Sequence, residues 1–370
     1  MMTYFALIFF SFLFCFVAKS KKKGKLYIGS GKKISENNLA ISVFFLMLWF
    51  LLACRSVEIG TDTENYQFYF DRYKHMNFFR IVEKPEPLFG VLNWLIGKVT
   101  NDFQIYMAIV AAINIIPIAF LYNQDKRHSY LKIILFVNMS VFVMLFSGIR
   151  QSIAMGIGLV AFHFVKKKKL VSFLITVIIA LGFHQSAFIL FAMYPLYYFR
   201  IKKKHIYYLI PLIAIVYIFN QRIFSRLLII MRLFGTKYDE YAEIGGTGAV
   251  MMIICFAAFT IFAYIIPDAT KEDNEFIGIR NYLLLATLIQ CFAPLHNWAM
   301  RMNYYYILFV PLVIPKVLDN ADVKWKQVSK LAEIVMCVFF TVYFIITVYT
   351  GCQTDGGALN TFPYVPFWVD

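Results

Sequence analysis

The sequence has few charged side chains. Asp, Glu, Lys and Arg make up 15% of its 370 residues, whereas hydrophobic residues make up 61%. A soluble domain has about 25% charged residues, so this composition excludes a soluble enzyme. Repeated apolar runs of about twenty residues are instead typical of helices that cross a bilayer. The sequence therefore predicts an all-α fold, that of a polytopic integral membrane protein.

Cysteine spacing of the kind that binds metals or carries redox chemistry is also missing. The six cysteines occur singly, and we interpret them as small hydrophobic residues without a disulfide. The first apolar run, Met1 to Ala18, lacks a small-residue cleavage site, and its basic cluster follows the run instead of preceding it. We therefore expect a retained helix with its N-terminus outside, not a signal peptide.

The positive-inside rule predicts the topology from that basic cluster, Lys19 to Lys33, which we expect in the cytoplasm. Residues 1–370 then form a single membrane domain with outer loops at about 55–102 and 220–248 and an outer C-terminal tail, 350–370. Counting the first run, about twelve spans follow. The others are expected at 38–54, 103–122, 131–147, 149–165, 170–183, 185–199, 206–219, 249–266, 277–295, 302–315 and 331–349.

This topology separates the two kinds of basic residue. Most lysines fall inside, as membrane insertion requires. Most arginines fall outside, where planar, bidentate recognition of phosphate or carboxylate would use them. The outer arginines are Arg55, Arg72, Arg80, Arg150, Arg222, Arg226, Arg232 and Arg301. The outer face is therefore expected to bind a large anion, with contact to lipid headgroups as the alternative.

Arg150 stands in Gly148-Ile-Arg150-Gln151, at the start of a helix of apolar and small residues. The first turn of a helix favours an anion, and a guanidinium there makes a phosphate site. The alternative is an arginine that snorkels to the membrane surface. The small residues Gly148, Ser152 and Gly156 would let a neighbouring helix or a lipid chain approach closely.

A polar loop runs from Arg55 through Gly60-Thr-Asp-Thr63 to Tyr66. The turn residues indicate that Asp62 or a threonine caps the next helix. The functional alternative makes Asp62 or Glu64 a base or an acceptor for a sugar hydroxyl, with Arg55 and Tyr66 in the same pocket. A divalent cation on Asp62 and Glu64 is a third reading, but two carboxylates do not specify one, and we expect no metal.

His184 lies at the outer apex between two segments too short to cross the bilayer untilted. Short or broken helices around an outward-facing cavity are expected there. An isolated histidine can be a structural hydrogen-bond donor, but Gln185 and Ser186 beside it favour proton transfer as an equal alternative. Residues 221–234 form an expected interfacial amphipathic helix, and 238–248 form either a lid or a connector.

Three motifs, in order, resemble the EpsG family of bacterial membrane proteins, which is similar to the Wzy-type polysaccharide polymerases. They are Arg55 with Gly60-Thr-Asp-Thr63 and Tyr66, then Gly148-Ile-Arg150-Gln151, then Phe183-His184-Gln-Ser186-Ala187. Arg301 with Tyr304 resembles a C-terminal feature of the family. The resemblance covers most of the chain.

The resemblance implies a membrane glycosyltransferase that joins undecaprenyl-pyrophosphate-linked oligosaccharide repeat units outside the bacterial plasma membrane. The product would be an exopolysaccharide, a capsule or an O-antigen. Flippase and chain-length regulator are implied partners, with no cofactor and no nucleic acid. His184, Asp62 and Arg150 are the expected catalytic residues. The expected substrate-binding residues are Arg55, Thr61, Thr63, Tyr66, Gln151, Ser186, Arg301 and Tyr304.

Two other functions compete with polymerisation. A flippase for the same lipid-linked sugars would need intramembrane charges near the midplane, whereas the charges here cluster at the outer ends of spans. A membrane O-acyltransferase would need its histidine within reach of a cytoplasmic acyl donor, which an outer His184 does not suit.

Overall fold

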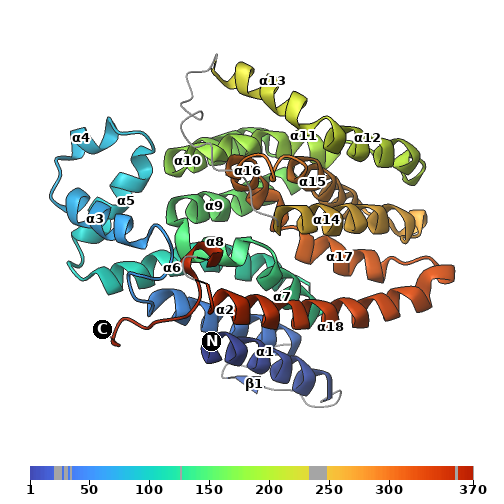
Figure 1. The fold of residues 1–370 in the computed structure, drawn as a ribbon, viewed down its shortest axis with the longest axis horizontal. Helices are drawn as coiled ribbons and strands as arrows, with labels where there is room; N and C mark the ends of the chain where they lie inside the picture. Colours follow the sequence, from blue (N-terminus) through green and yellow to red (C-terminus); the bar gives the residue numbers. More distant parts are fainter. Residues whose placement is uncertain are drawn as a thin grey trace. The chain divides into compact units, whose positions relative to one another are not determined.

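The computed structural model describes residues 1–20, 27–28, 32–33, 36–125, 127–232, 248–354 and 357–369. Apart from the two-residue strands β1 (Tyr27–Ile28) and β2 (Lys32–Lys33), its regular structure is helical (Figure 1). The all-α prediction is therefore confirmed for this part of the chain. Much of the basic cluster and the expected lid at 238–247 lie outside the described residues.

The chain forms two compact units, Met1–Phe188 with Glu333–Asp370, and Ile189–Ala332. The first contains α1 (Met2–Ser20), α2 (Glu36–Ala53), α3 (Thr63–Lys74), α4 (Phe78–Val82), α5 (Pro87–Gly97), α6 (Phe103–Tyr122), α7 (Ser129–Asn138), α8 (Val141–Ser147), α9 (Ile149–Lys166), α10 (Leu170–Phe183), most of α18 (Lys326–Gly351) and η6 (Gly357–Asn360). The second contains α11 (Met193–Tyr198), α12 (Ile206–Ile218), α13 (Asn220–Arg232), α14 (Gly248–Ile265), α15 (Asn274–Gln290), α16 (Asn297–Ile307) and α17 (Val310–Asp319). The 3₁₀ segment η1 (Gln185–Ala192) joins them.

By length and composition, two helices of the described chain can cross a membrane, Phe103–Tyr122 and Val323–Gly351, or up to four if two bent pairs each count as one span. The structure is a helical membrane protein, but it does not confirm about twelve spans. The prediction of one helix over 131–147 is wrong. Met139 is extended, with ψ 142°, so α7 ends and α8 starts again at an angle of 58°.

The first unit has an aromatic and aliphatic core beneath the loop that precedes α6. Tyr66 and Phe70 of α3 and Phe89 of α5 are buried against Tyr106 of α6 and Ile149 of α9. The small-residue face of α9 meets a neighbouring helix at Gly156, where a Cβ would contact the Pro117 ring of α6. Two short helices, α3 and α5, are thereby fixed against the ends of α6 and α9.

The C-terminal segment, residues 357–369, is built into the same loop. Backbone amides of Gly60 and Ser56 donate to the carbonyls of Asn360 and Val365, and the Phe367 amide donates to the Cys54 carbonyl. Gly60 itself has φ +90°, and a Cβ there would collide with the Phe146 carbonyl oxygen at the end of α8. The loop therefore lies tightly between the C-terminal segment and the α8–α9 junction.

The second unit packs around α15. Asn281 donates to the carbonyls of Leu196 and Phe199, and Arg280 forms an ion pair with Glu272. The predicted amphipathic helix is present as α13, joined to α12 with a bend of 74°.

Candidate functional site

Glu86 is the centre of a cluster of charged side chains in the first unit. It stands between Pro85 and Pro87, at the residue before α5 begins, with a left-handed backbone (φ 59°, ψ 54°). A residue other than glycine rarely adopts this conformation, and the strain persists only where surrounding contacts hold it. Such strain in a loop beside a cavity is typical of functional sites.

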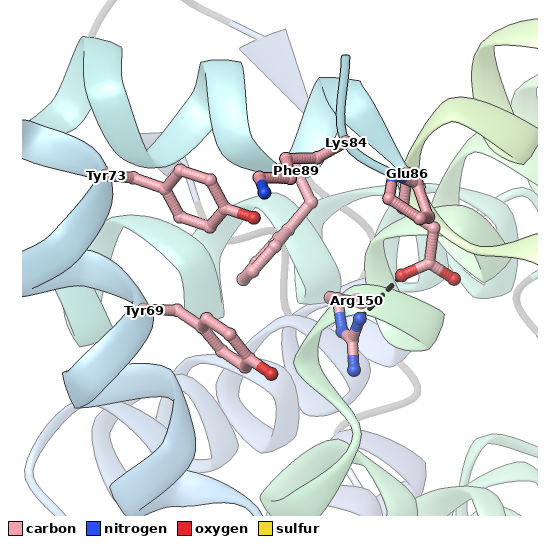
Figure 2. A pocket seen from close by; sticks show the side chains of 7 residues that line it. Tyr69, Tyr73, Lys84, Glu86, Phe89 and Arg150 are labelled. Atoms are coloured by element: carbon pink, nitrogen blue, oxygen red, sulfur yellow. Dashed lines mark hydrogen bonds and ion pairs between the residues drawn. The ribbon is translucent and has the colours of Figure 1, made fainter. Parts of the chain in front are cut away.

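Three groups converge on the Glu86 carboxylate. An Arg150 Nη1 N–H donates to Oε2 at 2.6 Å, and Figure 2 shows this ion pair. His184 Nδ1 lies 2.7 Å from Oε1, and the Gln185 backbone N–H donates to the same oxygen at 3.0 Å. We call Glu86, Arg150, His184 and the Gln185 amide the Glu86 cluster.

Electrostatics keep Glu86 ionised. Burial alone would raise the pKa of its carboxyl group, but the hydrogen bond and charge of His184, the charge of Arg150 and the Gln185 N–H together lower the pKa below its usual value of 4.5. An ionised carboxylate only accepts hydrogen bonds, so His184 must donate its Nδ1 proton to it. In the neutral form of the ring, the other nitrogen, Nε2, then has a lone pair that can accept a proton. It has no hydrogen-bond partner among the described residues.

The local sequence explains how these groups meet. The α8 helix ends at Ser147 and α9 begins at Ile149, so Arg150 lies in the first turn, as predicted. The α10 helix ends at Phe183, and His184 follows in an extended conformation. A Cβ at Gly182 would overlap the Leu88 side chain, so glycine allows the end of α10 to approach the start of α5. That approach places His184 beside Glu86.

A cavity of about 180 Å³ opens beside the cluster. The Arg150 guanidinium lies 5.8 Å from the ring centroids of both Tyr69 and Phe89, within reach of cation–π attraction. The Arg150 side chain is 36% exposed, whereas that of Glu86 is 8% exposed. The cavity is lined by Tyr69, Tyr73, Lys84, Pro85, Glu86, Phe89 and Arg150 (Figure 2). A guanidinium that is both anchored and exposed can contact an anion there.

Asp62, the other acid considered as a base, lies outside the Glu86 cluster. It occupies the N-cap position of α3, but its side chain makes no capping hydrogen bond, so the expected cap is wrong. The reason is its backbone, φ −107° and ψ 0°, which differs from the extended conformation that aims a cap side chain at the first helical amides. The third reading, a divalent cation on Asp62 and Glu64, was not the expected one and stays a hypothesis.

The polar loop instead holds its other predicted residues in structural contacts. Arg55 is 2% exposed and donates one hydrogen bond, to the Leu52 carbonyl. Thr61 and Ser147 share a hydrogen bond of 2.6 Å between their hydroxyl groups, and the Thr63 hydroxyl donates to the Ile59 carbonyl. Their predicted substrate contacts stay predictions, although the Thr61–Ser147 bond does connect this loop to the helix that carries Arg150.

The remaining predicted residues divide between the units. Tyr66 is buried and interacts electrostatically with Arg150. Gln151 and Ser186 are buried. In the sequence, Gln151 follows Arg150 directly and Ser186 lies two residues after His184. Arg301, exposed, and Tyr304, buried, lie on α16 of the second unit. Within the described ranges, no group of three or more His, Cys, Asp and Glu side chains is placed to hold a metal ion.

Sequence reasoning missed Glu86 and two tyrosines of the cavity. Glu86 lies in a short loop and matches no motif. An acidic residue between two prolines, directly before an apolar helix, is nevertheless an unusual pattern. Tyr69 and Tyr73 follow Tyr66 at spacings of three and seven, which is one face of a helix. That aromatic face was a usable signal.

The fold and this geometry define a helical membrane protein with a carboxylate, a histidine and an arginine gathered beside a cavity. The chain belongs to the EpsG family, whose model matches residues 38–365, a range that contains the whole Glu86 cluster. This confirms the resemblance seen in the sequence and makes the chain a membrane protein of polysaccharide biosynthesis. No curated protein and no solved structure is significantly similar to it.

Proposed function

We propose that this protein is a polysaccharide polymerase that joins lipid-linked oligosaccharide repeat units at the Glu86 cluster. The observation that carries the proposal is the convergence of His184 and Arg150 on one buried carboxyl group beside a cavity. Polymerisation needs a base for the attacking sugar hydroxyl and a cation for the departing pyrophosphate. The cluster supplies both within one site.

His184 is the proposed base. Glu86 fixes its Nδ1–H, so Nε2 is left to take the proton of the acceptor hydroxyl. Glu86 itself suits this task poorly because its lowered pKa makes it a weak base. In the described part of the chain no hydrogen bond or ion pair joins Asp62 to the cluster, so we assign the role to His184 and leave Asp62 in the supporting loop.

Arg150 is the proposed partner of the leaving group. In the reaction, the acceptor oxygen bonds to the anomeric carbon of the donor sugar, the bond from that carbon to the pyrophosphate oxygen breaks, and its electron pair leaves with undecaprenyl pyrophosphate. A guanidinium held by Glu86 through one nitrogen keeps other N–H groups for this growing charge. A fixed, partly desolvated cation stabilises such charge more than a mobile one.

We place the site on the outer face of the plasma membrane, where the positive-inside rule puts Arg150 and His184. A cysteine introduced at position 62 should react with an impermeant maleimide in intact cells, and one at position 168 should not. Labelling at 168 from outside would reverse this orientation.

The decisive experiment is extension of a defined lipid-linked repeat unit by the purified protein. Products longer than one repeat unit support the polymerase, and their absence with active controls from a related pathway contradicts it. In a deletion strain, single repeat units exposed on the outer leaflet indicate a lost polymerase. Repeat units retained inside would instead indicate a lost flippase.

A further inference from the structure

Two tyrosines of α3 form one wall of the cavity beside Glu86. The rings of Tyr69 and Tyr73 stack, with centroids 6.1 Å apart and planes at 30°. Phe89 meets both edge-on at 6.5 Å and is itself buried. These contacts fix the two rings in the absence of a ligand, so the wall is preorganised for binding.

The hydroxyl groups of this wall are unused by the protein. Neither the Tyr69 nor the Tyr73 hydroxyl has a hydrogen-bond partner among the described residues, and Figure 2 shows both pointing into the space that Arg150 and Phe89 border. Two other tyrosines of this unit do find partners, since Tyr4 donates to the Thr361 carbonyl and Tyr130 bonds Thr341, whereas the Tyr106 hydroxyl has none in the described part of the chain but lies in the core and does not line this cavity. Aromatic surface flanked by open hydroxyl groups suits a pyranose ring, which has apolar C–H faces and a hydroxyl rim.

The cavity also carries a cation that the protein does not neutralise. Both oxygens of Glu86 are engaged within the cluster, so its charge is matched by Arg150. Lys84 lines the same cavity, is exposed, and has no ion-pair partner in the described part of the chain. Two cations and one satisfied carboxylate therefore leave the cavity with net positive charge, which favours an anionic ligand.

We propose that this cavity binds a glycosyl diphosphate, with the first pyranose ring on Tyr69 and Tyr73 and the diphosphate between Lys84 and Arg150. The inference deepens the proposed function and rests on it, since it assigns the cavity to the donor substrate and its reducing-end sugar. Lys84, Tyr69 and Tyr73 are then binding residues that select the donor. They make no covalent contribution to the reaction.

The test is steady-state kinetics of purified variants with a lipid-linked repeat unit as substrate. Tyr69→Phe and Tyr73→Phe keep the rings and the packing, so both variants should fold. Each should raise KM about 2- to 12-fold with little change in kcat, the effect of one lost neutral hydrogen bond. Lys84→Met should raise KM about 10-fold or more, because a charge-assisted bond is lost.

Matched controls come from the same loop. Phe79→Ala removes an exposed ring of α4 that neither lines the cavity nor contacts Tyr69 or Tyr73, and Lys98→Met removes an exposed lysine whose ammonium lies over Trp94. Neither control should change KM by as much as about two-fold, the smallest effect of one neutral hydrogen bond.

Binding of undecaprenyl pyrophosphate, which has no sugar, separates the two parts of the cavity. Lys84→Met should weaken its binding about 10-fold, whereas the two Tyr→Phe variants should not change it. Wild-type elongation with unchanged KM in all three variants would overturn this inference and leave the polymerase intact. If the wild type fails to elongate, the proposed function fails, while weakened binding in Lys84→Met would still support the diphosphate site.

Discussion

Two Arg–Glu ion pairs in the described part of the chain differ in their surroundings. In the second unit, Arg280 is fully buried, donates to both Glu272 oxygens and to the Ile201 carbonyl, and lies 4.2 Å from the Tyr264 ring centroid. In the first unit, the Arg150 side chain is 36% exposed and gives Glu86 a single hydrogen bond. The Arg280 pair leaves no guanidinium surface for a ligand, whereas the Arg150 pair does.

The two carboxylates also differ in their partners and in their backbone conformation. Glu272 has one arginine as its ion-pair partner, whereas Glu86 also receives His184 and a backbone amide and sits on strained backbone at a cavity. An ion pair that only stabilises a fold needs no histidine and no strain. The comparison therefore separates a structural pair from the pair we propose to be functional, by exposure, by the third partner and by backbone conformation.

The largest expected effect is that of His184→Ala. This variant removes the histidine that contacts Glu86, a partner that Glu272 does not have among the described residues. Loss of a general base costs about 100- to 10,000-fold in kcat. Lipid-linked substrate should still bind, because the cavity lining is unchanged. The control is His163→Ala, an exposed histidine of α9 with no place in the cluster. Elongation assays with matched protein amounts check this, and equal loss of binding and turnover would make His184 structural.

The second effect is on stability. Arg280→Met removes a fully buried arginine and should lower the free energy of unfolding by about 3–5 kcal/mol, since the Glu272 side chain, 9% exposed, is left unpaired. The double variant Arg280→Met with Glu272→Leu should recover most of that loss. Thermal unfolding in detergent measures both. If Arg280→Met were as stable as the wild type, this pair would not have the structural role inferred here.

The sequence predicted the parts of the site that motifs carry and missed those that the fold assembles. Arg150 at a helix start and His184 at the end of a helix follow from local patterns of small residues and short apolar segments. Glu86 could not be connected to them, because its contacts span separations of 64 and 98 residues. The break at Met139 was missed for a similar reason: it is stabilised by the Asn138 side chain, which donates to the Phe340 carbonyl of α18.

The third effect is that of Arg150. Arg150→Ala should lower turnover about 10- to 150-fold, because one charge-assisted hydrogen bond to the leaving group contributes about 1.5–3 kcal/mol. Arg150→Lys keeps the charge but loses the planar fork that serves Glu86 and the anion together, so it should recover only part. Polymer chain length in a deletion strain, at matched membrane levels, measures this. Wild-type polymer from Arg150→Ala would rule out the phosphate site and favour snorkelling.

The smallest effect is a dependence of stability on acid pH. The pKa of Glu86 is lower in the folded protein than its usual 4.5, so its carboxylate adds stability that is fully present above about pH 4.5 and is lost as pH falls through the folded value. Glu86→Gln lacks this contribution. The difference in melting temperature between the wild type and the variant should therefore be constant from about pH 7 to pH 5 and shrink below about pH 4. A difference that stays constant through the acid range would mean that His184 and Arg150 do not hold the carboxylate ionised.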